Sequence, residues 1–245
     1  MQPKEPQVLA FFESCHQLCQ KLLYLLGEGL EVGSRTIVLR CRQPANNLIK
    51  VGDFFASAHT VTRGESSSIL RFLRYPPPDT TSHSVNDLRA GAHSDYGSIT
   101  LLFRLKGQAG LEILRQGDTW EAVPVCPPGT EDDPSPPILV NIGDLLSYWT
   151  NGLFRSTVHR VAFPKTGTQD SIEEKSADPR YSIAFFCHPT GSTKLDPVPS
   201  DRVRRHTEMN PSQASVSSSE KKALTADEHL MTKLAATYGT LYNKA

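Results

Sequence analysis

The stretch that decides the fold is Gly91-Ala-His93-Ser-Asp95-Tyr-Gly-Ser-Ile-Thr-Leu-Leu-Phe103. His93 and Asp95 stand at the start of a run rich in β-branched and apolar residues, so we expect a strand here. In an extended strand, residues i and i+2 project to the same face, which brings an imidazole and a carboxylate to one point. This pair supplies two thirds of the 2-His-1-carboxylate set that holds non-haem Fe(II). Taken alone, it is equally compatible with a histidine that is hydrogen-bonded at a strand end.

Two later segments add the residue types that such a centre needs. Phe154–Phe163 has a strand pattern that places His159 on one face. About twenty residues on, Arg180–Phe186 is again strand-like, with Arg180 and Ser182 on a common face. A guanidinium is the natural bidentate partner of a carboxylate, and a serine hydroxyl can add a second hydrogen bond. The sequence therefore indicates a metal site together with an anchor for an acid.

The ordered motifs His93-x-Asp95, His159 and Arg180-x-Ser182 resemble the Fe(II)- and 2-oxoglutarate-dependent oxygenases of the isopenicillin N synthase-like family. The similarity covers roughly Ser68–Pro199. The sequence segments around these motifs also resemble those of the family: Arg71-Phe-Leu-Arg-Tyr75-Pro-Pro, His93-Ser-Asp95-Tyr-Gly-Ser-Ile-Thr-Leu-Leu, Asn141-Ile-Gly-Asp, Thr150-Asn-Gly, Val158-His-Arg-Val and Phe186-Cys-His-Pro.

The resemblance implies a mainly β fold with flanking helices (α+β), built on a double-stranded β-helix, or jelly-roll, core. It implies iron at one mouth of the barrel, with 2-oxoglutarate as co-substrate and O2 as oxidant. The metal ligands would be His93, Asp95 and His159, and the residues that bind 2-oxoglutarate would be Arg180, Ser182 and Tyr75. An alternative for Tyr75 is a core tyrosine at a strand end. From the predicted sheet faces, the candidate substrate-pocket residues are Tyr96, Phe103 and Phe186.

The expected activity is that of a dioxygenase that hydroxylates, desaturates or cyclises a small molecule while 2-oxoglutarate is decarboxylated to succinate. We expect a role in specialised, or secondary, metabolism. Two alternatives stay open. One is an Fe(II) oxidase of the same fold that uses no 2-oxoglutarate. The other is a truncated, non-catalytic remnant, because family members carry a segment before the long helix near which this chain begins.

Composition narrows the class of protein. The 245 residues can bury one sizeable core, and the 26 basic and 26 acidic residues give no basic block for nucleic acid or an anionic membrane. The five cysteines form no Cys-x-x-Cys pair, and Cys15 and Cys19, at i,i+4, favour a buried thiol pair over a zinc site. No signal peptide or membrane-spanning run is present. We expect a cytoplasmic monomer.

The remaining pattern divides the chain into three regions. Residues 1–67 form an N-terminal helical region with an irregular insertion near 33–50, residues 68–199 the oxygenase core, and residues 200–245 a polar segment with a C-terminal covering helix. Apolar residues at helical spacing predict a long helix over Glu5–Gly29. Leu111–Leu114 and Trp120–Val123 predict a hairpin.

The C-terminal region contains a second metal-like motif. Pro197–Lys222 has a polar composition that predicts poor order, and His206-x-Glu208 lies within it. We discount this motif because no strand pattern orients it. Thr225-Ala-Asp-Glu228 is a capping box that predicts a helix over Ala226–Tyr242.

Overall fold

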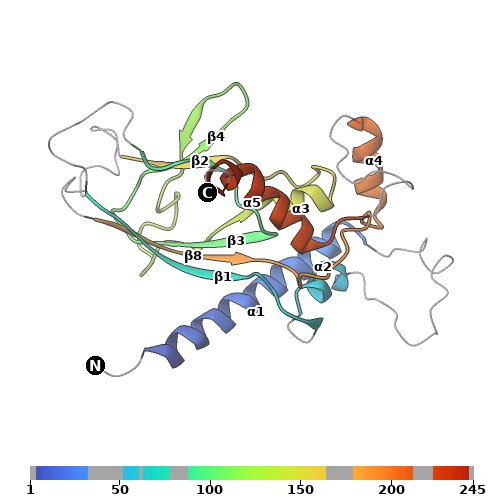
Figure 1. Ribbon diagram of the computed structural model, residues 1–245. Coiled ribbons are helices and arrows are strands. Elements are labelled where there is room, and N and C mark those ends of the chain that lie inside the picture. Colours follow the sequence, from blue (N-terminus) through green and yellow to red (C-terminus); the bar gives the residue numbers. More distant parts are fainter. Residues whose placement is uncertain are drawn as a thin grey trace.

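The computed structural model describes residues 4–32, 52–60, 63–77, 88–163, 179–211 and 223–242. Within these ranges the chain forms two antiparallel four-stranded sheets with helices around them (Figure 1). The predicted mainly β core with flanking helices is therefore confirmed. The predicted insertion near 33–50 lies outside the described residues, and the three-region division of the chain stays a prediction.

The larger sheet has the strand order β1-β8-β3-β6 and the smaller sheet the order β2-β7-β4-β5. Apart from β4 and β5, neighbouring strands in each sheet are not consecutive in the sequence, as a jelly roll requires. The larger sheet consists of β1 (Ile69–Tyr75), β8 (Arg180–Cys187), β3 (Ile99–Arg104) and β6 (Leu139–Ile142). The smaller sheet consists of β2 (Leu88–His93), β7 (His159–Ala162), β4 (Leu111–Leu114) and β5 (Trp120–Ala122). The pairing of β4 with β5 confirms the predicted hairpin.

The register of the larger sheet defines its two faces. Residues opposite each other on neighbouring strands share a face, and Thr100 on β3 is opposite both Phe186 on β8 and Asn141 on β6. The face that carries Thr100 is called the inner face here. Continuing the alternation along the strands places further residues on it: Leu102 and Arg104 from β3, Arg180, Ser182 and Ala184 from β8, and Arg71, Leu73 and Tyr75 from β1.

Helix α1 (Glu5–Gly29) covers the outer face of the larger sheet, with the bounds that the sequence predicts (Figure 1). Its aromatic rings meet those of the sheet: Phe11 and Phe103 have ring centroids 5.1 Å apart. Cys15 and Cys19 are buried free thiols, as predicted. The short α2 (Asp53–Ala58) packs on α1 and completes this apolar layer.

Helix α3 (Asp144–Trp149) packs its Trp149 ring against Phe54 and Phe55 of α2, and α5 (Ala226–Tyr242) contacts α3. The predicted capping box of α5 is present and reciprocal. The Thr225 amide donates to the Glu228 carboxylate at 2.7 Å, and the Glu228 amide donates to the Thr225 hydroxyl at 3.2 Å. No helix among the described residues is long and apolar enough to cross a membrane.

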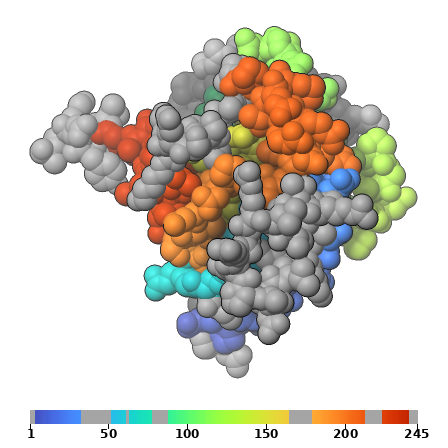
Figure 2. All heavy atoms as spheres, turned by 90° about the vertical axis from the view of Figure 1, so that its right-hand side faces the viewer, coloured from blue at the N-terminus to red at the C-terminus, as the bar shows by residue number. Residues whose placement is uncertain are grey.

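Two predictions of local structure were wrong. Part of Pro197–Lys222 is helical: Asp201–Met209 forms α4, whose surface atoms are deep orange in Figure 2. The Ser200 hydroxyl accepts from the amides of Arg202 and Val203, so a local cap starts this helix although its composition is polar. In addition, only His159–Ala162 of the predicted strand Phe154–Phe163 pairs in a sheet.

Candidate iron centre

Three side chains of the required types converge at one mouth of the barrel. His93 ends β2 and is paired directly with His159 at the start of β7. The two ring centroids are 4.4 Å apart, and Nε2 of His159 is 3.8 Å from Oδ1 of Asp95. Each residue offers one ligand atom, and these atoms all lie within 4.8 Å of one another. This is a compact two-nitrogen, one-oxygen set of the type that holds non-haem Fe(II).

The local geometry of the His-x-Asp motif differs from the prediction. The sequence pattern predicts His93 and Asp95 on one extended strand, but β2 ends at His93 and β3 begins only at Ile99. Asp95 therefore lies in the connection between the smaller and the larger sheet. The two side chains meet because the chain crosses from one sheet to the other here, and not because of strand periodicity.

Asp95 is held by two neighbours on the inner face. The Thr100 hydroxyl and the Asn141 amide each donate to Oδ2 of Asp95 at 2.7 Å. Asp95 is only 6% exposed, and these bonds leave Oδ1 on the side of His159. Outer partners of this kind orient a metal-binding carboxylate. Sequence reasoning missed both, although each stands in a motif quoted above.

Both histidines have their second ring nitrogen directed at a backbone carbonyl. Nδ1 of His93 lies 2.8 Å from the Gly91 oxygen, and Nδ1 of His159 lies 3.1 Å from the Thr157 oxygen. A carbonyl oxygen can only accept, so Nδ1 carries the proton in each ring. The lone pair is then on Nε2, which is the atom that a metal would use.

The connection that carries Asp95 is fastened to the start of α3. The amides of Asp144 and Gly143 donate to the carbonyls of Asp95, at 2.7 Å, and Ser98, at 2.9 Å. Lys233 of α5 lies 2.9 Å from the Asp144 carboxylate. Burial raises the pKa of Asp144, but the charge of Lys233 and the hydrogen bonds from Lys233 and Ser94 outweigh it, and the pKa is lowered below its ordinary value. The carboxylate stays charged and ties α5 to the site.

The predicted acid anchor lies on the inner face of β8. Arg180 is 2% exposed and Ser182 is 4% exposed. Nε of Arg180 donates to the carbonyl of Ala109 at 3.0 Å and more weakly to that of Gln108. The Arg180 guanidinium lies over the Tyr75 ring, 5.2 Å from its centroid. Tyr75 therefore packs against the anchor.

The three candidate substrate-pocket residues are not brought together. Phe186 is on the inner face, in the same layer as Thr100. Tyr96 lies in the connection that carries Asp95, and its hydroxyl donates to Thr237 of α5 at 2.7 Å. Phe103 projects from the outer face of β3 onto Phe11 of α1. Its environment is the helix–sheet core, so we do not carry Phe103 into the proposed pocket.

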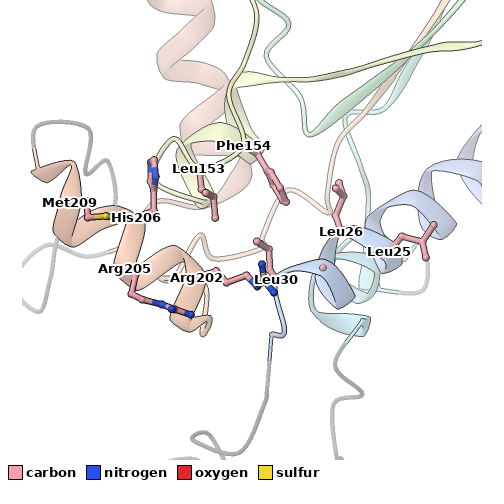
Figure 3. A pocket seen from close by; sticks show the side chains of 10 residues that line it. Leu25, Leu26, Leu30, Leu153, Phe154, Arg202, Arg205, His206 and Met209 are labelled. Atoms are coloured by element: carbon pink, nitrogen blue, oxygen red, sulfur yellow. The ribbon is translucent and has the colours of Figure 1, made fainter.

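The discounted motif His206-x-Glu208 lies on α4, where residues two apart point to nearly opposite sides. His206 lines a groove with Leu153 and Met209 between α4, α1 and the end of α3 (Figure 3). Glu208 instead faces Arg204 at 3.4 Å. None of the residues that line this groove belongs to the His93, Asp95 and His159 set or to the acid anchor.

Residues 64–189 match the family model of the 2OG-Fe(II) oxygenase superfamily. Because this stretch is just over half of the 245 residues, the chain belongs to that superfamily. The matched stretch contains all strands of both sheets together with the triad and the acid anchor.

Individual relatives agree with this family. The chain is 37% identical over 161 residues to UPF0676 protein C1494.01 of Schizosaccharomyces pombe (64% of this chain, 43% of that protein). It is 31% identical over 189 residues to the 2-oxoglutarate-dependent dioxygenase htyE of Aspergillus rugulosus (77% of this chain, 48% of that protein). The chain thus spans less than half the length of these curated relatives.

Solved structures show the same likeness. A full-length protein of Neurospora crassa, solved in complex with alpha-KG, which is 2-oxoglutarate, superposes with a TM-score of 0.66. The two sequences are 26% identical, and the match covers 96% of this chain and 57% of the Neurospora crassa chain.

Proposed function

We propose that this protein is an Fe(II)- and 2-oxoglutarate-dependent dioxygenase that oxidises a small molecule. The observation that carries the proposal is that His93, Asp95 and His159 converge at one mouth of the barrel, while Arg180 and Ser182 are buried on the inner face of the same barrel. In the proposed site, Nε2 of each histidine and Oδ1 of Asp95 hold Fe(II). When bound, iron with 2-oxoglutarate supplies the oxidising power for attack on a C–H bond, and succinate and CO2 are formed.

The chain's own residues then have separate tasks. Thr100 and Asn141 fix the Asp95 carboxylate, and the carbonyls of Gly91 and Thr157 fix the two imidazoles. These contacts keep the three ligands in place before the metal arrives, which lowers the cost of ordering them.

Arg180 and Ser182 bind the far carboxylate of 2-oxoglutarate in this proposal. Two backbone carbonyls and the Tyr75 ring hold the Arg180 guanidinium in position. Because Arg180 is 2% exposed, water competes little for its N–H groups. Tyr75 supports the guanidinium, and a direct bond from Tyr75 to the co-substrate stays a prediction.

For the substrate we propose a small planar molecule that stacks on Phe186. The Arg71 guanidinium lies 5.4 Å from the centroid of the Phe186 ring, and both residues are on the inner face. A ring and a cation at the iron-bearing mouth suit a flat, polar heterocycle. The same Neurospora crassa protein has also been solved with alpha-KG and thymine, and that structure is 26% identical with a TM-score of 0.65.

The role in specialised metabolism, the cytoplasmic location and the monomeric state stay predictions from the sequence.

The decisive experiment is an anaerobic titration of the purified protein with Fe(II) and then 2-oxoglutarate. We expect a weak visible charge-transfer band that saturates with 2-oxoglutarate. Turnover with thymine or a related heterocycle is then followed as succinate formed per O2 consumed. Turnover without added 2-oxoglutarate and without succinate would establish the 2-oxoglutarate-independent oxidase instead. A folded protein that binds neither Fe(II) nor 2-oxoglutarate would establish the non-catalytic remnant.

Arg180 variants test the acid anchor. Loss of a buried charged partner costs about 3–5 kcal/mol, so Arg180→Ala should raise the 2-oxoglutarate requirement roughly a few hundred- to a few thousandfold. Arg180→Lys should recover only part, because a point charge cannot reproduce the fork. Ser182→Ala should cost about 1 kcal/mol. The matched control is Arg74→Ala, which removes an exposed arginine from the outer face of β1.

A further inference from the structure

A second arginine lies beside the acid anchor, and the motifs gave no reason to single it out. Arg104 is the last residue of β3 and is paired with Ser182 of β8. Ser182 is also paired with Leu73 of β1, so all three side chains are on the inner face. Arg104 is 6% exposed. Its position in the register thus places a second buried arginine next to the Arg180–Ser182 pair.

The hydrogen bonds of Arg104 fix the guanidinium but do not use all of its donors. Nη1 donates to the Pro124 carbonyl at 2.9 Å, and Nη2 donates to the Val125 carbonyl at 3.3 Å. Nε is buried and has no hydrogen-bond partner among the residues that the structure describes. A buried N–H group without an acceptor costs free energy, so a ligand atom that accepts its hydrogen bond would be stabilised there.

The charge of Arg104 is also uncompensated within the described part of the chain. Burial lowers the pKa of its guanidinium, and the only charge effect that opposes this comes from Cys126. A guanidinium nevertheless stays protonated in a protein. Its hydrogen-bond acceptors are carbonyls, and the described residues provide it with no carboxylate. A buried cation without an anion is costly, so an anion that enters this end of the barrel would be attracted.

The distance along β3 from Arg104 to the candidate iron centre suits the binding of an elongated anion. Thr100, which bonds the Asp95 carboxylate, is four residues before Arg104 on the same strand and face. At the usual rise of a strand, their α-carbons are about 13 Å apart. A molecule that reaches from the iron toward Arg104, Arg180 and Ser182 must therefore carry an acidic group at its far end.

We infer that Arg104 is a third residue that binds the co-substrate, and that its Nε donates a hydrogen bond to the far carboxylate held by Arg180 and Ser182. The inference rests on the proposed function and deepens it. Two guanidinium groups at one end make the pocket select 2-oxo acids with a second carboxylate over those that end in a methyl group.

The test compares two ligands that differ only at the far end. Mn(II) replaces iron so that no turnover occurs, and calorimetry gives the dissociation constants of 2-oxoglutarate and 2-oxopentanoate, which has a methyl group in place of the far carboxylate. For the wild-type protein we expect a strong preference for 2-oxoglutarate. Arg104→Gln should reduce this preference about ten- to a hundredfold, the effect of losing one charged hydrogen bond, and leave 2-oxopentanoate binding unchanged. Arg74→Gln is the matched surface control.

A purely structural role of Arg104 would give a different result. Arg104→Gln would then weaken both acids equally or leave the preference unchanged, and either outcome overturns the inference. If Arg104→Gln does not fold, Arg104→Lys decides: it keeps the charge but not the Nε donor, so the preference should fall several-fold, and an unchanged preference overturns the inference. A preference that falls in Arg180→Ala but not in the Arg104 variants removes this inference alone. No preference in the wild-type protein removes the proposed function as well.

Discussion

The α-carbon of Gly143 lies against the carbonyl oxygen of Gly97, with no room for a Cβ between them. Gly143 has an ordinary φ of −98°, so close approach and not backbone conformation requires glycine here. The contact brings the start of α3 onto the connection that carries Asp95. It explains why a glycine stands in the motif Asn141-Ile-Gly-Asp.

Gly143→Ala should therefore displace the connection that carries the metal-binding Asp95. The added methyl group also meets the Asp95 carbonyl oxygen at 3.0 Å. Overpacking of this kind costs about 1–3 kcal/mol of unfolding free energy, and Mn(II) affinity should fall with it. Urea unfolding and metal titration check both effects. Gly91→Ala is the control, because a Cβ on Gly91 has no neighbour within 4 Å. Equal effects of the two variants would contradict this explanation.

Single substitutions of the triad should abolish metal binding. His93→Ala, Asp95→Ala and His159→Ala each leave two ligands, which hold a metal weakly and with the wrong geometry. Anaerobic Fe(II) titration of the folded variants measures the loss. The control is His206→Ala on α4, which should bind Fe(II) as the wild type does. If His206→Ala loses iron while the triad variants keep it, the assignment is wrong.

The partners of Asp95 should tune the metal affinity without abolishing it. Thr100→Val removes the hydroxyl that donates to Oδ2 of Asp95 and keeps the shape of the side chain. Loss of such an outer contact lowers metal affinity roughly ten- to a hundredfold. Asn141→Leu should act similarly. Thr157→Val is the matched control, because its backbone carbonyl, and not its hydroxyl, faces His159. Wild-type affinity in Thr100→Val would show that the hydrogen bond has no such role.

Acid should destabilise the fold through buried histidines. Burial lowers the pKa of His59 from 6.5 to about 4. Both ring nitrogens of neutral His59 have hydrogen-bond partners, since Nδ1 donates to the Phe55 carbonyl and Nε2 accepts from the Ser98 hydroxyl. Between these pH values the unfolded chain binds a proton that the folded chain does not. The unfolding free energy therefore falls as the pH drops from about 6.5 to about 4, by ~3 kcal/mol for this residue.

Comparison with His59→Gln isolates this effect. Urea unfolding of both proteins at several pH values gives the difference in unfolding free energy. The wild type should lose its advantage progressively below pH 6.5. A difference that stays constant from pH 7 to pH 4 would mean that His59 titrates normally in the folded state.

The sequence by itself determined the elements with strong local signals. Helix α1 has the bounds that its apolar period predicts, because a stripe at helical spacing can be buried in only one way. The capping box of α5 is equally local. The five site residues His93, Asp95, His159, Arg180 and Ser182 were named from motifs, since residue type and order carry the chemistry.

Only the tertiary structure decided which of these residues meet and what supports them. The crossover that places Asp95 between the sheets, the bonds from Thr100 and Asn141, and the position of Arg104 beside Ser182 all depend on pairings between distant strands. Phe103 was misplaced for the same reason: its face is set by the register of β3 with β8 and by α1. A register shift of one residue reverses every side chain on a strand. The alternation along β3 separates Ile99, Leu101 and Phe103 from Thr100, Leu102 and Arg104, but it does not say which set faces the barrel and which faces α1.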